Sequence, residues 1–257
     1  MTKLSFQIKQ QLELFILALG FFTRIPVPDI KEFSQTKLNH ASRYFSLVGW
    51  FIGAVSALCY LFLVALFPLP LAVLLTMGIG FLLTGCFHED GLADTADGLG
   101  GGWTPQQKLT IMKDSRLGSY GAVGLWFTLT TKFVILTHLS EPALAFLVAH
   151  PLSRIITNGL IYTLSYVSDH DSSKAKPLAE TMQSRDLWIN TLIGGSALLL
   201  VSSSMMVLII AFFLSFGLIR YFLQRQLGGF TGDTLGAAQQ VSELLVYMIL
   251  LNAESSS

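Results

Sequence analysis

The feature that most constrains this chain is a run of 44 residues, from Tyr44 to Phe87, that contains no Asp, Glu, Lys or Arg. A second charge-free run extends over 33 residues, from Leu187 to Ile219. One helix needs only about 20 apolar residues to cross the hydrocarbon core of a bilayer. Only 12% of the 257 residues are charged, against about 25% in ordinary soluble domains. The sequence therefore predicts a protein that crosses the membrane several times.

The apolar segments predict an all-α fold, a polytopic membrane helical bundle with about seven transmembrane helices. The segments that qualify are residues 44–67, 69–87, 121–138, 142–167, 187–203, 205–223 and 235–252. Serines at 202–204 divide the second charge-free run better than Gly194 and Gly195 do. The apolar stretch Leu12–Phe22 is too short to span, so we expect a short N-terminal re-entrant or interfacial helix there. We expect one integral-membrane domain over residues 1–257.

Lysine and arginine are distributed unevenly along the chain. Of the 16 Lys and Arg, 14 fall in segments on one side of the expected spans, and the other two, Lys132 and Arg154, lie inside spans. The positive-inside rule places the basic side in the cytoplasm. We therefore expect a multi-pass protein of the bacterial inner membrane with its long polar loops in the cytoplasm. The formal net charge of zero argues against a nucleic-acid partner.

Three aspartates follow the first charge-free run directly. If this stretch is helical, Asp90, Asp94 and Asp97 stand at positions i, i+4 and i+7 and share one face. Like charges repel each other unless a cation neutralises them, and hard carboxylate oxygens suit Mg²⁺ or Mn²⁺. A solvated acidic helix end is the alternative interpretation. We favour a metal site, because no Lys or Arg interleaves between residues 88 and 107.

A second polar cluster ends just before the third expected span. It places Lys113, Asp114 and Arg116 beside Gly118. Basic side chains next to glycines suit phosphate binding, because backbone N–H groups approach closely and a guanidinium grips two oxygens. The alternative is a juxtamembrane cap with ordinary positive-inside charges. Because the cluster shares a loop with the aspartates, we favour a functional role.

Other polar residues near the ends of the expected spans have two interpretations each. Asp233, in a glycine-rich turn, is either the N-cap of the last span or a further metal ligand. Arg24, beside two prolines, is either an interfacial anchor or a binding residue. Arg43 stands at the start of the first charge-free run.

Charged residues inside a membrane span are costly and by default mark a functional site or a paired network. Lys132 and Arg154 both lie mid-span, and Glu243 in the last span is a candidate partner. Arg154 comes soon after Pro151, and we expect it to face a polar cavity. His150 is better explained as satisfying the proline kink than as a ligand.

Four motifs occur in the chain: FFTRIPVP at 21–28, HEDGLADTADG at 88–98, MKDSRLGSYG at 112–121 and GGFTGDTLGA at 228–237. With these motifs in this order, the chain resembles the cobalamin synthase family, also called adenosylcobinamide-GDP ribazoletransferases, from Phe21 to Leu251. In one departure, the chain has Glu89 where family members usually carry leucine. Glu89 is therefore not assumed to be a shared ligand.

The resemblance implies the last assembly step of vitamin B12 synthesis. Adenosylcobinamide-GDP and α-ribazole, or α-ribazole 5′-phosphate, give adenosylcobalamin, or its 5′-phosphate, and GMP, with Mg²⁺ as cofactor. Asp90, Asp94 and Asp97 would hold Mg²⁺, and one of them or Asp114 would accept the hydroxyl proton. The expected substrate-binding residues are Arg24, Arg43, Lys113, Arg116, Gly118, Arg154 and Asp233. The partners are these substrates and the lipid bilayer, and assembly into a homo-oligomer stays open.

Two other classes of protein remain as alternatives. A membrane CDP-alcohol phosphotransferase or prenyltransferase shares aspartate-rich metal motifs, but releases CMP or inorganic pyrophosphate in place of GMP. A secondary transporter also buries charged residues, but it places its charged determinants near the membrane midplane within inverted repeats. Here the acidic residues gather in an expected cytoplasmic loop.

Overall fold

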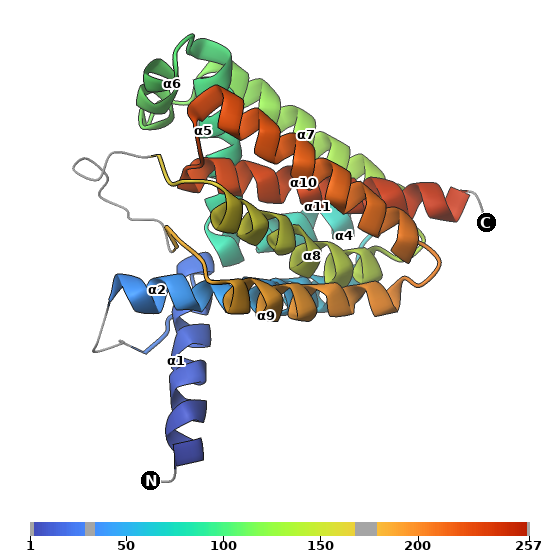
Figure 1. The fold of residues 1–257 in the computed structure, drawn as a ribbon. Coiled ribbons are helices and arrows are strands. Elements are labelled where there is room, and N and C mark those ends of the chain that lie inside the picture. The colour runs from blue at the N-terminus through green and yellow to red at the C-terminus, as the bar shows by residue number, and fades with distance from the viewer. Residues whose placement is uncertain (1–2, 29–33, 168–178, 256–257) are drawn as a thin grey trace.

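The computed structural model describes residues 3–28, 34–167 and 179–255, and every named element in these ranges is a helix (Figure 1). This confirms the expected all-α bundle. In chain order the elements are α1 (Lys3–Phe22), α2 (Gln35–Ala41), η1 (Ser42–Tyr44), α3 (Phe45–Val64), α4 (Leu69–Thr84), α5 (Phe87–Gly101), α6 (Pro105–Met112), α7 (Ser119–His138), α8 (Pro142–Thr163), α9 (Ser184–Gly195), η2 (Ser196–Leu200), α10 (Met205–Leu227) and α11 (Gly232–Ser255).

Five of the expected spans are confirmed as helices long and apolar enough to cross a membrane: α3, which is continuous with α2 and η1, and α7, α8, α10 and α11. The 16-residue α4 meets the same criteria only together with α5, from which it is bent by 88°. Because α5 carries Glu89, Asp90, Asp94 and Asp97, whose charges are costly in the hydrocarbon core, we place it outside the spanning segments. The expected span over 187–203 is not one continuous α-helix, because α9 ends at Gly195 and the 3-10 helix η2 follows. The change to 3-10 geometry follows Gly194 and Gly195, whose helix propensity is low. The turn that separates this segment from α10 lies at residues 202–204, which confirms the serines as the point of division.

The centre of the bundle is formed by α8 and α11. The most apolar window of α8 is 72% buried and that of α11 61%, against 22% for α7 and 11% for α10. Close packing of α3 on α8 depends on Gly49 and Gly53. A Cβ on Gly49 would lie 2.5 Å from the carbonyl oxygen of His150, and one on Gly53 would lie 2.6 Å from that of Phe146. Small residues four positions apart allow membrane helices to approach in this way.

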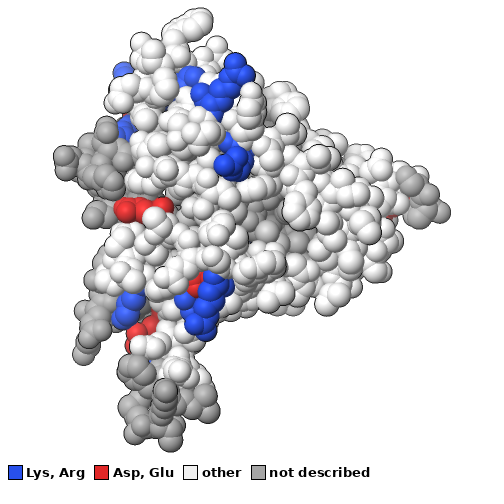
Figure 2. Space-filling model, in the orientation of Figure 1, with Lys and Arg blue, Asp and Glu red and all other residues white. Residues whose placement is uncertain are grey.

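Charged side chains gather over one end of the molecule. On the face shown in Figure 2, Lys and Arg lie over the end that carries α2, α5 and α6, and the opposite end is nearly free of charge. The turns that follow α3, α7 and η2 contain no Lys or Arg. At the charged end, α1 projects away from the bundle (Figure 1) and is not among the helices apolar enough to span. This separation of charge matches the one expected from the sequence.

The separation of charge predicts which engineered cysteines an impermeant thiol reagent reaches in intact cells. Gln106, on α6, and Ser203, in the turn before α10, are both exposed. In a background with Cys59 and Cys86 replaced by serine, Ser203→Cys should be labelled from outside. Gln106→Cys should be labelled only after the membrane is permeabilised. The reverse pattern would invert the orientation.

Candidate active site

Helix α5 begins at a sharp corner. Gly85 (φ 66°) and Cys86 (φ 58°) both adopt the left-handed conformation, which is free of strain for glycine and unusual for cysteine. Arg24 lies against this corner. Its backbone N–H donates to the Leu83 carbonyl at 2.8 Å, and its guanidinium lies where a side chain on Gly85 would stand. The predicted binding residue Arg24 is therefore placed at the start of α5.

The first turn of α11 brings Asp233 to the aspartates of α5. The two helices approach closely at Gly91, where an added Cβ would lie 2.8 Å from the Asp233 carbonyl oxygen. Burial and then the charges of Asp233, Asp90 and Asp97 raise the pKa of Asp94 to about 7. We call Asp90, Asp94 and Asp233 the acidic cluster. Of the two interpretations of Asp233, its position beside these carboxylates favours the metal ligand.

The acidic cluster has the donor chemistry that a hard divalent cation requires. In the ranges that the structure describes, no three His, Cys, Asp or Glu side chains are grouped closely enough to hold a metal ion as they stand. However, Mg²⁺ keeps several waters and commonly uses only one or two carboxylates. Repulsion from the neighbouring carboxylates adds to the effect of burial on the pKa of Asp94, and a bound cation would relieve this repulsion. The residues of the cluster therefore fit Mg²⁺.

Asp97 has a different role from the one that its helical spacing predicts. Its carboxylate accepts hydrogen bonds from the backbone N–H groups of Gly118 (2.7 Å) and Gly121 (2.8 Å). These groups lie at the start of α7, where an anionic partner is favourable. Both of its oxygens accept hydrogen bonds from backbone N–H groups, so the structure gives Asp97 a capping role, and its role as a metal ligand stays a prediction. The Gly118 N–H, expected at a substrate phosphate, is occupied by the same contact.

This contact predicts a loss of stability when the Asp97 side chain is removed. Asp97→Ala leaves two backbone N–H groups at the start of α7 without their acceptor and should cost about 1–2 kcal/mol. Asp97→Asn retains one acceptor oxygen and should cost less. Thermal unfolding of the purified proteins in one detergent measures both. An Asp97→Ala protein as stable as the wild type would contradict the capping role.

The loop before α7 contains an ion pair between two predicted site residues. Arg116 donates from Nε and Nη2 to the carboxylate of Asp114 at 2.5–3.1 Å, and its side chain is 86% exposed. These hydrogen bonds lower the pKa of Asp114 to about 2, so Asp114 is a weak base near neutral pH. We therefore withdraw Asp114 as the acceptor of the hydroxyl proton. Lys113 lies exposed at the end of α6, and the phosphate-binding role of Lys113 and Arg116 stays a prediction.

Arg43 is engaged away from the acidic cluster. It is buried, and its Nη2 lies 2.5 Å from a carboxylate oxygen of Asp186. Its Nη1 donates to Gln11 at 3.1 Å, and Asp186 also contacts His40 at 2.8 Å. These contacts join α1, η1 and α9. The expectation that Arg43 binds substrate is corrected, because its charge is already neutralised within the fold.

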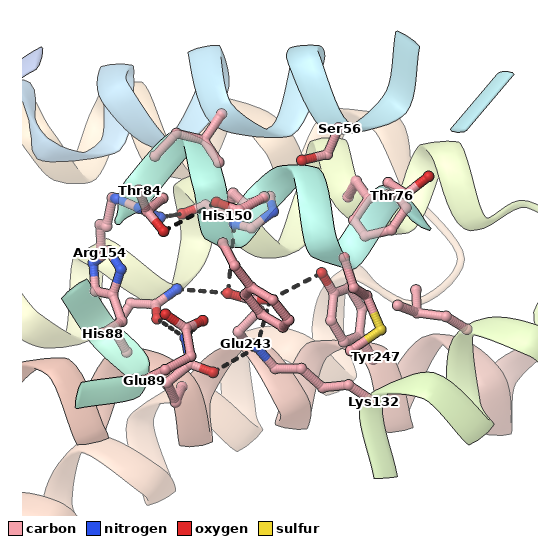
Figure 3. A pocket seen from close by; sticks show the side chains of 18 residues that line it. Ser56, Thr76, Thr84, His88, Glu89, Lys132, His150, Arg154, Glu243 and Tyr247 are labelled. Carbon is pink, nitrogen blue, oxygen red and sulfur yellow. Dashed lines mark hydrogen bonds and ion pairs between the residues drawn. The ribbon is translucent and has the colours of Figure 1, made fainter. Parts of the chain in front are cut away.

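A second polar site lies inside the bundle (Figure 3). Lys132 from α7 pairs with Glu243 from α11, with Nζ 2.9 Å from Oε1, which confirms the expected partner. The Tyr247 hydroxyl donates to the same oxygen at 3.1 Å, and His150 Nδ1 lies 3.4 Å from the other oxygen. His150 therefore contacts a carboxylate in addition to standing at the kink. We call the polar side chains around Glu243 the buried network.

Arg154 lines the cavity of Figure 3 together with Lys132 and Glu243, as the sequence predicts. It is 1% exposed, and in the described part of the chain no carboxylate lies within 4.0 Å of its guanidinium. Its Nη1 donates to the His150 carbonyl at 2.6 Å, its guanidinium carbon lies 6.0 Å from the centre of the Phe22 ring, and its Nε has no partner. A buried cation without a counterion is unfavourable, so Arg154 is a candidate for binding an anionic group.

Sequence patterns do not indicate Gln239 and Gln240, which connect the buried network. Gln239 donates to Glu243 at 2.6 Å, and Gln240 donates to Glu89 at 3.0 Å. Glu89 thus belongs to the buried network and not to the acidic cluster. The one available signal was the pair of amides standing three and four positions before Glu243, which places them near it on a helix.

The bundle and its two polar sites define an integral-membrane protein with a carboxylate-rich site at its charged end. The chain belongs to the family described as cobalamin-5-phosphate synthase, whose model matches residues 14–251. This confirms the resemblance found in the four motifs. Relatives named adenosylcobinamide-GDP ribazoletransferase include one from Shewanella pealeana, 51% identical over 95% of this chain and 96% of its own. Another, from Vibrio cholerae, is 48% identical over 95% of each chain. No solved structure matches the chain.

Proposed function

We propose that this chain is an adenosylcobinamide-GDP ribazoletransferase. A hydroxyl oxygen of α-ribazole, or of its 5′-phosphate, attacks the phosphorus next to cobinamide. The bond from this phosphorus to the GMP oxygen breaks, and the hydroxyl proton passes to a carboxylate of the enzyme. The products are adenosylcobalamin, or its 5′-phosphate, and GMP. The observation that carries the proposal is the match to one family over residues 14–251.

The acidic cluster is suited to this displacement. Asp94 is the proposed general base. Burial, the largest cause of its raised pKa, persists when a cation neutralises the neighbouring carboxylates, and it makes Asp94 a stronger base than an exposed aspartate. Asp90 and Asp233 are the proposed ligands of Mg²⁺, which when bound would neutralise charge on the pyrophosphate. The two helices that carry these residues, α5 and α11, meet at Gly91 and hold base and ligands at a fixed separation.

Two arginines beside the start of α5 are the proposed phosphate ligands. Arg24 lies at the corner where α5 begins, and Arg154 lies inside the bundle without a carboxylate partner in the described residues. His88 on α5 lines the same cavities as Arg154. A guanidinium suits a phosphate because it offers two parallel N–H donors. Both arginines therefore have donors available near α5.

We place the site on the cytoplasmic face of the bacterial inner membrane. The acidic cluster lies at the end of the bundle where the Lys and Arg of Figure 2 gather, and such an end faces the cytoplasm. A nucleotide-linked substrate supplied in the cytoplasm would reach this end without crossing the membrane.

The experiment that tests the proposal measures GMP. The full chain, purified into lipid nanodiscs, is given adenosylcobinamide-GDP, α-ribazole and MgCl₂. We expect GMP only when both substrates are present, and far less of it after EDTA treatment or in Asp90→Asn. Absence of GMP, with CMP or inorganic pyrophosphate released from a CDP-alcohol or a prenyl diphosphate, would support the alternative transferase classes.

A further inference from the structure

One amide side chain joins the buried ion pair to the helix that carries the catalytic aspartates. Gln240 Oε1 accepts from Lys132 Nζ at 2.6 Å, and Gln240 Nε2 donates to Glu89 Oε1 at 3.0 Å. Gln240 is 2% exposed. Through these two hydrogen bonds, Gln240 on α11 connects α7 to α5. Its partner on α5, Glu89, immediately precedes Asp90.

Glu89 is held under unusual conditions for a carboxylate. Its second oxygen, Oε2, is buried with no hydrogen-bond partner, and it borders the cavity of Figure 3 together with Lys132 and Arg154. A buried carboxylate that loses a donor carries a large desolvation penalty. Without the hydrogen bond from Gln240, a conformation that exposes the Glu89 carboxylate to water would therefore be lower in free energy than the buried one.

The geometry of a helix makes such a movement costly for the acidic cluster. Successive residues are about 100° apart around the axis, so a rotation of α5 that exposes Glu89 turns Asp90 and Asp94 through the same angle. Both aspartates would then move away from Asp233, which is fixed on α11. The hydrogen bond to Glu89 thus holds the orientation of α5.

We propose that Gln240 is a positioning residue for the acidic cluster: by holding Glu89 inside the bundle, it keeps Asp90 beside Asp233 so that together they hold a divalent cation. This inference rests on the proposed function, which assigns Mg²⁺ to these carboxylates. It adds a residue inside the bundle that touches neither substrate nor metal and yet sets the affinity for the metal.

The chain offers a matched control in the neighbouring residue. Gln239 is also an amide, is 1% exposed, and belongs to the same buried network. Its amide nitrogen donates to Glu243 at 2.6 Å and to Ser153 at 3.1 Å, and its Oε1 accepts from Gln240 Nε2 at 2.9 Å. Among the described residues, its hydrogen bonds therefore join α11 to α8 and none of them reaches α5. Loss of either amide removes a similar amount of buried polar contact, but only Gln240 holds Glu89.

The test is Mn²⁺ binding, followed by electron paramagnetic resonance on the full chain in nanodiscs without substrate. We expect Gln240→Leu to raise the Mn²⁺ dissociation constant by about tenfold or more, equivalent to 1.4 kcal/mol. Gln239→Leu should stay within about twofold of the wild type, although both variants lose thermal stability. Gln240→Asn keeps the polarity but shortens the side chain, and gives a second measurement if the leucine variant does not fold.

A double variant separates positioning from general damage. Replacing both partners of a buried hydrogen bond by apolar groups removes the penalty of the unpaired one. Glu89→Leu combined with Gln240→Leu should therefore bind Mn²⁺ more tightly than Gln240→Leu alone, and as tightly as Glu89→Leu alone. Equal losses in Gln239→Leu and Gln240→Leu, or no rescue in the double variant, would overturn the positioning role. Asp90→Asn should abolish Mn²⁺ binding, and wild-type binding by that variant would instead overturn the metal assignment in the proposed function.

Discussion

Replacing Asp94 by asparagine is expected to lower the rate of GMP formation by at least about tenfold, or 1.4 kcal/mol of transition-state stabilisation. Asparagine keeps the shape of the side chain but cannot accept the hydroxyl proton. The same change is expected to raise the thermal stability of the metal-free protein, because it removes a charge that is disfavoured by burial and then by repulsion from Asp233 and Asp90. Loss of activity with gain of stability distinguishes a functional carboxylate from a structural one.

The pH dependence of stability follows from the direction in which folding shifts the pKa of Asp94. Folding raises it from 3.8 to about 7, so between these values the folded state binds more protons than the unfolded state. The contribution of Asp94 to the free energy of unfolding therefore falls as pH rises through this window. In EDTA, the melting temperatures of the wild type and of Asp94→Asn should differ least near pH 5, and the variant should be clearly the more stable near pH 8.

A control variant tests whether this result is specific to Asp94. The pKa of Asp114 is lowered to about 2 by hydrogen bonds from Arg116. Asp114→Asn should therefore show no gain in stability near pH 8, because this carboxylate is not repelled in the folded state. Normal turnover by Asp94→Asn, or a lower melting temperature than the wild type near pH 8, would contradict the role of Asp94.

Local periodicity predicted the acidic helix, and tertiary contacts then divided its residues. The spacing of Asp90, Asp94 and Asp97 places all three on one face, but spacing does not reveal what that face meets. Two backbone N–H groups at the start of α7 donate hydrogen bonds to the carboxylate of Asp97. Asp233, more than 130 positions along the chain, comes to the other two because Gly91 lets α11 approach.

The same limit applies to residues whose partners are distant in sequence. Arg43 looks like any arginine beside a membrane span, and its role depends on Asp186, which reaches it from α9. By contrast, the cost of burying a charge in a span was enough to predict that Lys132 needs a partner and that Glu243 is a candidate. Strong physical penalties can be recognised in a sequence, whereas the choice among several permitted contacts requires the fold.

The buried ion pair leads to the largest stability effect that we expect. Glu243 is 4% exposed and accepts from Lys132, Gln239 and Tyr247. Glu243→Ala leaves the Lys132 ammonium buried without a counterion, and such a change typically costs about 3–5 kcal/mol.

Removing both charges should cost much less than removing one, because the penalty comes from the unpaired ion and not from the loss of attraction alone. We therefore expect Lys132→Met combined with Glu243→Gln to melt at a higher temperature in detergent than Glu243→Ala. The matched single variant Glu243→Gln, which keeps the volume and one acceptor oxygen, should fall between them. If the double variant is the least stable of the three, the ion pair contributes net stability of its own, and the assumption that desolvation of Lys132 dominates is wrong.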